Sequence, residues 1–162
     1  MSKKPLQSRQ ALVEAAQARL SRETGTLFKD APTRVALCYP SPYHVGMSSL
    51  GFQHIYGLIH ARAGATAERV FLPDDVETHR RLGAPLLTLE TQRPAVGAEV
   101  LAFSVAYELE LTGLFAMLEL MGLPARREAR ASSAPLVVAG GPLTFSNPDP
   151  LEPFVDVVVQ GE

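Results

Sequence analysis

The sequence predicts an α/β fold in which a parallel sheet of about five strands carries helices on both faces. Five short apolar runs show almost no polar alternation, as expected of strands buried on both sides; they cover residues 34–39, 67–72, 99–105, 135–139 and 154–159. Segments with helical spacing of apolar residues lie between several of these runs. This order is typical of right-handed β-α-β crossovers.

Length and composition fit one compact domain. The chain has 162 residues, 46% of them hydrophobic, so it can bury a sizeable core. Its 15 basic and 17 acidic residues are mixed along the chain, without the basic runs of nucleic-acid binders. No apolar run approaches the roughly 18 residues needed to span a membrane, and the chain starts with polar sequence. We therefore expect a soluble, cytoplasmic protein with neither nucleic acid nor membrane as partner.

Residues 1–33 predict a helix and a linker ahead of the α/β domain. Apolar residues recur at helical spacing among polar ones over about 6–23, which predicts an exposed helix with a thin apolar stripe. Glycine and proline break this pattern over 24–33. The α/β domain is therefore expected to cover residues 34–162. Because the chain ends directly after its last predicted strand, we expect it to be the amino-terminal piece of a longer protein.

Inside the domain, the remaining segments predict helices and connections. Apolar spacing and glycine stop signals predict helices at about 47–63, 76–82 and 109–121. Residues 85–90 fit an edge strand or an extended connection equally well. A surface connection is expected at 126–133, and a proline-rich loop with at most one helical turn at 144–153.

The carboxyl ends of parallel strands meet at one edge of a sheet, where such folds bind ligands. The loops that follow the five strands begin at Pro40, Pro73, Ser104, Gly140 and Gly161. We expect them to lie side by side, with the strand that ends at 105 next to the first strand.

The loop at 40–51 holds the first candidate residues. His44 has a side chain that titrates near neutral pH and suits a metal ligand or a proton carrier. No other histidine or carboxylate stands at ligand spacing, so a structural or hydrogen-bonding role is favoured. Tyr43 either packs against a ligand or covers the sheet edge, and Gly46 belongs to the same loop.

The turn Gly140-Gly141-Pro142 is the second candidate. Two residues without Cβ let a backbone approach a flat or phosphate-bearing ligand closely, but they serve a tight turn equally well. No GxGxxG or GxxxxGK[ST] pattern accompanies them, which disfavours a nucleotide-phosphate site.

The strand end near 105 supplies the third group. Ser104 and Tyr107 can hydrogen-bond a ligand, but no histidine and acid pair makes the serine a nucleophile. Glu90, Glu108 and Glu110 are either acid or base groups or solvated carboxylates. The residues alone identify no catalytic machinery.

Several short motifs together resemble a known family. From about 23 to 162 the chain is similar to the amino-terminal domain of bacterial radical SAM proteins that carry a cobalamin-binding-like domain. The matching stretches are GTLFKD (25–30), YP (39–40), YHVGMS (43–48), LGFQ (50–53), ERVF (68–71), LETQRP (89–94), FS (103–104), YE (107–108), AGGP (139–142), NP (147–148), PL (150–151) and GE (161–162).

The resemblance implies a flavodoxin-like (Rossmann-like) fold and a partner domain. In that family a barrel follows, with a CxxxCxxC motif that binds a [4Fe-4S] cluster and cleaves S-adenosylmethionine. Those cysteines are absent here, because Cys38 is the sole cysteine and lies inside the first apolar run. This segment is therefore not expected to be catalytic alone, and the cluster, S-adenosylmethionine and the barrel are expected downstream.

The resemblance also implies a possible corrinoid site. Domains that ligate cobalt with histidine carry D-x-H-x-x-G after the first strand, whereas residues 41–46 read SPYHVG and keep only the glycine. Cobalamin is thus expected to bind without a histidine ligand, or to be lost in a degenerate docking or small-ligand module. The residues expected to line the cofactor or ligand pocket are Tyr43, His44, Gly46, Ser104, Tyr107, Gly140, Gly141 and Pro142.

Overall fold

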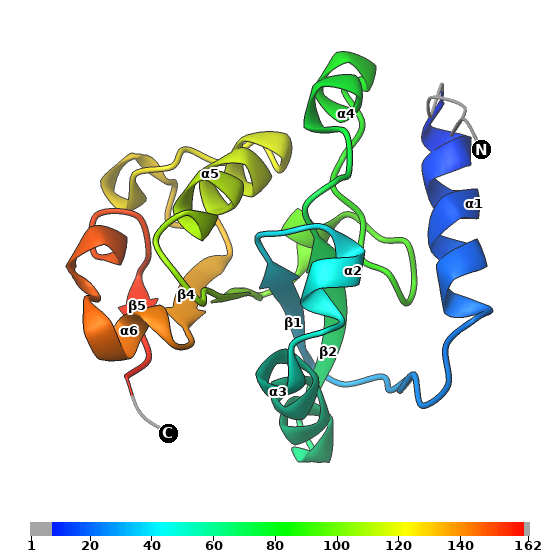
Figure 1. The fold of residues 1–162 in the computed structure, drawn as a ribbon, viewed down its shortest axis with the longest axis horizontal. Helices are drawn as coiled ribbons and strands as arrows, with labels where there is room; N and C mark the ends of the chain where they lie inside the picture. The colour runs from blue at the N-terminus through cyan, green and yellow to red at the C-terminus, as the bar shows by residue number, and fades with distance from the viewer. Residues whose placement is uncertain (1–7, 161–162) are drawn as a thin grey trace.

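A computed structural model describes residues 8–160 and confirms the predicted α/β fold (Figure 1). Five parallel strands form one sheet in the flavodoxin-like order β2-β1-β3-β4-β5. They are β1 (Thr33–Tyr39), β2 (Ala65–Phe71), β3 (Val100–Ser104), β4 (Leu136–Gly140) and β5 (Val157–Val158). Strand β1 lies next to β3, as predicted. The first two residues of the predicted helix at 6–23 and the loop expected at Gly161 lie outside the described residues.

Strand β5 is shorter than the predicted run at 154–159. The backbone N–H groups of Phe154 and Val155 both donate to the carbonyl of Leu151 and so belong to a turn. Sheet bonding starts at Asp156, whose N–H donates to the carbonyl of Val137. Apolar character in this run therefore reflects burial in the turn as well as pairing in the sheet.

Helices occupy the predicted regions, and several short helical segments are additional to them. They are α1 (Arg9–Leu20), α2 (Tyr43–Gly46), α3 (Leu50–Ala61), α4 (Val76–Leu82), α5 (Glu110–Leu120) and α6 (Leu143–Ser146), with 3-10 turns at η1 (Ala95–Gly97), η2 (Arg127–Ala129) and η3 (Asp149–Leu151). The short helix α2 lies in the stretch predicted to be a loop. Two helical turns, α6 and η3, occupy the segment where at most one was expected.

Side chains of β1 alternate between two core clusters, one on each face of the sheet. Ala36 and Cys38 join the cluster that contains Leu114 of α5. Leu37 and Tyr39 join the cluster that contains residues of α3 and the apolar stripe of α1. This period of two is the geometry of a strand that is buried on both faces. None of the helices in the described part of the chain is long and apolar enough to cross a membrane.

Helix α5 approaches the loop after β1 very closely. A Cβ atom at Gly113 would lie 2.0 Å from the carbonyl oxygen of Pro40, so only glycine fits there. This contact fixes the first turns of α5 against the carboxyl end of β1. The helix is thereby held over the point where the strand order reverses.

Residues 85–90 and the turn after them cover the outer edge of β2. The sequence allowed either an edge strand or an extended connection for this segment. This segment makes one isolated antiparallel bridge, between Leu87 and Pro94. The N–H of Leu89 donates to the carbonyl of Arg69 at 2.8 Å, and the N–H of Arg69 donates to Oε2 of Glu90 at 2.7 Å. An extended connection therefore takes the place of a further strand.

Candidate functional site

The structure brings part of the predicted site together at the carboxyl edge of the sheet. Ser104 and Gly140 are register partners at the ends of β3 and β4. Gly141 and Pro142 follow directly, and Tyr107 lies in the exposed loop after β3. Ser104 and the turn Gly140-Gly141-Pro142 therefore lie side by side at this edge.

Tyr43 is turned away from this stretch. Its hydroxyl donates to Oε1 of Glu23 at 2.6 Å, and its ring packs edge-on against Phe71 at 5.2 Å between centroids. The guanidinium of Arg19 lies 5.0 Å from the ring centroid. Burial, followed by the hydrogen bond to Glu23, raises the pKa of Tyr43 to about 12. The tyrosine therefore joins the amino-terminal segment to the sheet.

His44 is exposed beside Tyr43 on α2. Residues 8–160 contain no group of three or more histidine, cysteine, aspartate or glutamate side chains that could hold a metal ion. The four-residue helix thus presents His44 to solvent near α1, while its neighbour points inward.

Two of the predicted glycines are required by packing. A Cβ atom at Gly46 would lie 2.5 Å from the ring of Phe71. Gly141 has a φ of +111°, and a Cβ atom there would lie 2.7 Å from the carbonyl oxygen of Val105. At Gly140 the nearest atom would be Cβ of Val159 at 3.4 Å, which is an ordinary contact. At Gly46 and Gly141, other protein atoms therefore fill the space that a side chain would need.

A buried carboxylate fills the gap between the loops after β1 and β3. Glu110, in the first turn of α5, is 2% exposed. Its Oε1 accepts from the hydroxyl of Ser41 at 3.2 Å, and its Oε2 accepts from the N–H of Ala106 at 2.7 Å. The sequence allowed either a solvated carboxylate or an acid or base; the structure excludes the solvated alternative, since both oxygens tie the two loops together. Glu108, by contrast, is exposed.

Four large apolar side chains are exposed at the carboxyl edge of the sheet. They lie on loops and short helices that follow β1, β3 and β4. Leu109 is 77% exposed, Phe145 59%, Tyr107 48% and Val45 37%. We call these four residues the apolar rim. No pattern in the sequence marks these residues as a group, because apolar residues near the start of a helix are typical of core positions.

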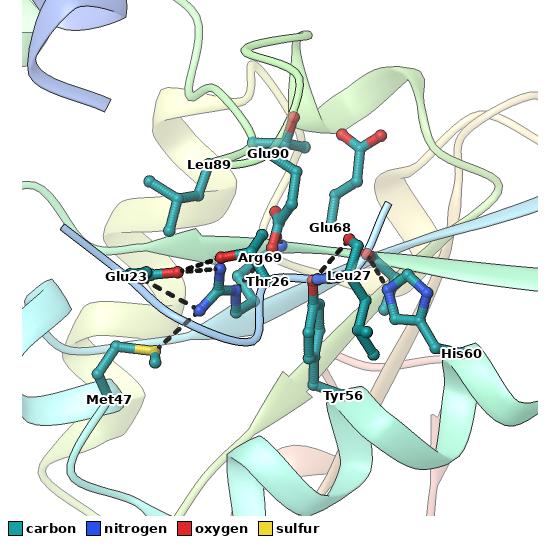
Figure 2. A network of polar contacts seen from close by, with 12 residues as sticks. Glu23, Thr26, Leu27, Met47, Tyr56, His60, Glu68, Arg69, Leu89 and Glu90 are labelled. Carbon is teal, nitrogen blue, oxygen red and sulfur yellow. Dashed lines mark hydrogen bonds and ion pairs between the residues drawn. The ribbon is translucent and has the colours of Figure 1, made fainter. Parts of the chain in front are cut away.

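A buried polar network surrounds Arg69 of β2 (Figure 2). Nε of this arginine is 2.6 Å from Oε1 of Glu90, and Nη2 is 2.7 Å from Oε2 of Glu23. The guanidinium also stacks 4.8 Å from the ring centroid of Tyr56 and contacts Sδ of Met47 at 3.2 Å. One buried cation on β2 therefore contacts Glu23 after α1, Met47 directly after α2, and α3.

The pKa values of the two carboxylates of this network are shifted in opposite directions, although burial acts to raise both. Burial raises the pKa of Glu90, and the contacts with Arg69 offset this only in part. For Glu23 burial acts in the same direction, but hydrogen bonds from Arg69, Tyr43 and Thr26 outweigh it and lower its pKa. Like Glu110, Glu90 is therefore not solvated. The sequence did contain one sign of this network, namely two adjacent charged residues inside the otherwise apolar run at 67–72.

The comparison with known families agrees with this architecture. The family model for radical SAM proteins, N-terminal, matches residues 51–162. The chain belongs to this family. The matched region of this radical SAM N-terminal domain runs from α3 to the end of the chain and includes the buried carboxylate Glu110 and most of the apolar rim. The relation to radical SAM proteins predicted from the sequence is thus confirmed. No curated protein matches the chain.

Proposed function

We propose that this radical SAM N-terminal domain docks, through the carboxyl edge of its sheet, on a cluster-bearing radical SAM domain downstream, and positions a substrate or cofactor against it. The apolar rim carries this proposal. Exposed apolar side chains that gather in one place mark interaction surfaces. At the same edge, Glu110 ties two loops together, so this edge offers a firm surface for a partner.

The chemistry of the cluster belongs to the partner in this proposal. Cys38 is the only cysteine in the sequence. It is fully buried in the core, and burial raises the pKa of its thiol. It does not fit as a cluster ligand, since iron is bound by several accessible thiolates. The domain contributes position and shape to the reaction.

Photo-crosslinking in the full-length protein tests the docking. A benzophenone amino acid in place of Tyr107 is expected to crosslink to the cluster-bearing domain on illumination. Position 136 gives a matched control, because Leu136 is 44% exposed against 48% for Tyr107 but lies at the amino end of β4. Equal crosslinking from both positions, or none from 107, would contradict docking through this edge.

A corrinoid at the same edge is a second candidate function. The register pairing of Ser104 with Gly140 favours it, since a hydroxyl and a residue without Cβ stand side by side where this fold binds ligands. The residues do not fit a histidine-ligated corrinoid, because Tyr43 stands at the position of the ligating histidine and is bonded to Glu23, and its neighbour His44 is exposed near α1. A corrinoid here would be held without a protein ligand to cobalt.

Absorbance separates this second function from docking alone. Full-length protein reconstituted with iron, sulfide and hydroxocobalamin is expected to keep corrinoid absorbance after desalting, and Gly140→Leu to lose it with unchanged iron content. Gly64→Leu is the control, because no atom lies within 4 Å of a Cβ atom at Gly64. Wild-type protein without corrinoid absorbance would leave docking as the function of this edge.

A further inference from the structure

We propose that the cavity between α1 and α4 binds a small molecule with an apolar body and one ammonium group, and that the ammonium pairs with the carboxylate of Asp75. This site lies on the flank of the sheet, at the carboxyl end of β2. It is separate from the apolar rim and does not depend on the docking proposed above.

The cavity is large enough for a single aromatic ring with a short side chain. Its volume is about 290 Å³, whereas an apolar cavity of about 150 Å³ already holds benzene. Helix α1 forms one wall, the end of β2 with α4 forms another, and residues 86–89 form a third (Figure 1). Leu12, Leu82 and Leu87 line the cavity from three sides and are only partly buried. Apolar surface is therefore accessible to a ligand.

The charged side chains of the described lining balance one another with one exception. Arg19 and Asp74 form an ion pair at 3.0 Å. Arg69 is bonded to Glu23 at 2.7 Å and to Glu90 at 2.6 Å, so its positive charge faces two carboxylates. The charge that remains in the lining is the carboxylate of residue 75. A ligand that completes this balance therefore carries a positive charge.

Asp75 is exposed at the start of α4 and is ionised at neutral pH. Its Oδ1 accepts from the N–H of Thr78 at 2.9 Å, and this bond is the main cause that lowers the pKa of the carboxyl group. Arg81 acts in the same direction, but it donates to the hydroxyl of Thr78 and does not line the cavity. No described residue forms an ion pair with Asp75 within 4.0 Å. Burial lowers the pKa of His79, so this side chain brings no positive charge into the lining.

The placement of these groups sets the orientation of the ligand. Asp74 and Asp75 are exposed, whereas Phe71, Leu86 and Leu89 of the same lining are buried. An ammonium group beside the exposed carboxylate keeps part of its hydration, while the apolar body leaves water. A ligand with a carboxylate would meet a like charge instead, and a neutral ligand would gain no ion pair.

Three fluorinated probes that share one ring test this charge preference in the purified full-length protein. They are 4-fluorophenethylamine, 4-fluorophenethyl alcohol and 4-fluorophenylacetate, which are positive, neutral and negative at neutral pH. In fluorine NMR titrations the amine should bind saturably and about fivefold tighter than the alcohol, as expected of an exposed ion pair. The carboxylate should bind more weakly than the alcohol. In about 1 M sodium chloride the amine should lose its advantage, because salt screens exposed charges.

Asp75→Asn is the decisive variant, because asparagine caps a helix as well as aspartate does but carries no charge. It should weaken the amine about fivefold, to the affinity of the alcohol, and change the alcohol less than about twofold. Glu77→Gln is the control, since Glu77 is exposed in the same helix but does not line the cavity. Its amine affinity should equal that of wild type. Ala15→Phe fills the cavity from α1 and should abolish binding of both the amine and the alcohol.

Four results would overturn the proposal. Absence of saturable amine binding in folded wild-type protein would show that the cavity takes no such ligand. Equal affinities of amine and alcohol in wild type would remove the charge preference. A preference that persists in folded Asp75→Asn would remove the role of Asp75, and unchanged binding in Ala15→Phe would place the ligand elsewhere. If Asp75→Asn does not fold, the salt dependence of the amine affinity in wild type decides the role of the charge.

Discussion

At the scale of single residues, the charged network around Arg69 decides how the amino-terminal segment is held. Side chains of Arg69 and Glu90 are 4% and 1% exposed, and that of Glu23 is 10% exposed. Removing one partner of a buried ion pair leaves the other charge unpaired, which costs about 3–5 kcal/mol. The network therefore fixes the linker on β2 more strictly than the thin apolar stripe of α1 could alone.

The lowered pKa of Glu23 predicts a pH dependence. A carboxylate with a pKa below its ordinary 4.5 stabilises the fold at neutral pH, and this contribution is lost as pH falls below that value. Glu90, with a raised pKa, contributes with the opposite sign. We expect Glu23→Gln to be less stable than wild type at neutral pH and to lose less further stability on acidification. Urea unfolding between about pH 6 and pH 3.5 measures both slopes.

Glu152→Gln, at an exposed position, is the control for this experiment. Its slope should parallel the wild-type slope. Parallel slopes for Glu23→Gln and wild type would contradict the assigned role of Glu23.

Gly113 predicts a second effect at this scale. Gly113→Ala places a Cβ atom 2.0 Å from the carbonyl oxygen of Pro40, so we expect a loss of about 3 kcal/mol in the free energy of unfolding. Gly57→Ala is the matched change in α3, where no atom lies within 4 Å of the new Cβ. It should stabilise the protein by about 0.5–1 kcal/mol. Denaturant unfolding compares the two, and effects of the same sign would contradict this account.

At the scale of secondary structure elements, the periodicity of apolar residues predicted the strands and helices. It did not predict contacts between residues that are distant in the sequence. Apolar runs and glycine stops predicted four strands and the helix at 76–82 closely, because burial on two faces and helix termination are local signals. For Glu90 and Glu110 the sequence left open whether they are acid or base groups or solvated carboxylates. Their partners Arg69 and Ser41 lie 21 and 69 residues away, so no local pattern shows the pairing.

The candidate site could be predicted only in part, because some of its contacts also join residues that are distant in the sequence. Parallel strands must end at one edge, which correctly brought Ser104 and Gly140 together. The side chain of Tyr43 was not predictable from its loop, because its direction follows from Glu23 and Phe71. Its neighbour Gly46 is likewise fixed by a ring from another strand.

The start of α3 gives a prediction for one element. The hydroxyl of Ser49 accepts from the N–H of Phe52 at 3.3 Å and caps the helix. We expect Ser49→Ala to lower the free energy of unfolding by about 1 kcal/mol. Ser48→Ala, next to it, removes only a bond from an exposed hydroxyl to the carbonyl of His44 and should stay within about 0.5 kcal/mol. Equal effects in urea unfolding would exclude Ser49 as the cap.

At the scale of the whole molecule, the two core clusters share one sheet and should unfold together. Strand β1 contributes alternate side chains to both, so neither cluster keeps its shape when the other is lost. Small single domains of this kind usually unfold in one cooperative transition. The sheet is thus the element through which a change on one face reaches the other.

Leu114→Ala tests this coupling. Leu114 is fully buried in the cluster under α5, and its truncation should cost about 2–5 kcal/mol. The sequence has no tryptophan, and three of its four tyrosines, Tyr39, Tyr43 and Tyr56, lie in or against the other cluster, so tyrosine fluorescence reports mainly on the opposite face. Fluorescence and circular dichroism midpoints should fall by the same amount. Separate midpoints would show two independent units, and Leu58→Ala, at a half-exposed position, serves as control.

The two outer edges of the sheet differ in their ability to pair with a strand of another chain. An open strand edge is a template for pairing with another chain. The backbone of β2 is already engaged by Leu89 and Glu90, whereas β5 forms the other border of the described sheet with only two residues. Any strand that extends this sheet must therefore add beside β5. Another strand can therefore pair with this sheet at its β5 edge, whereas residues of the same chain occupy the β2 edge.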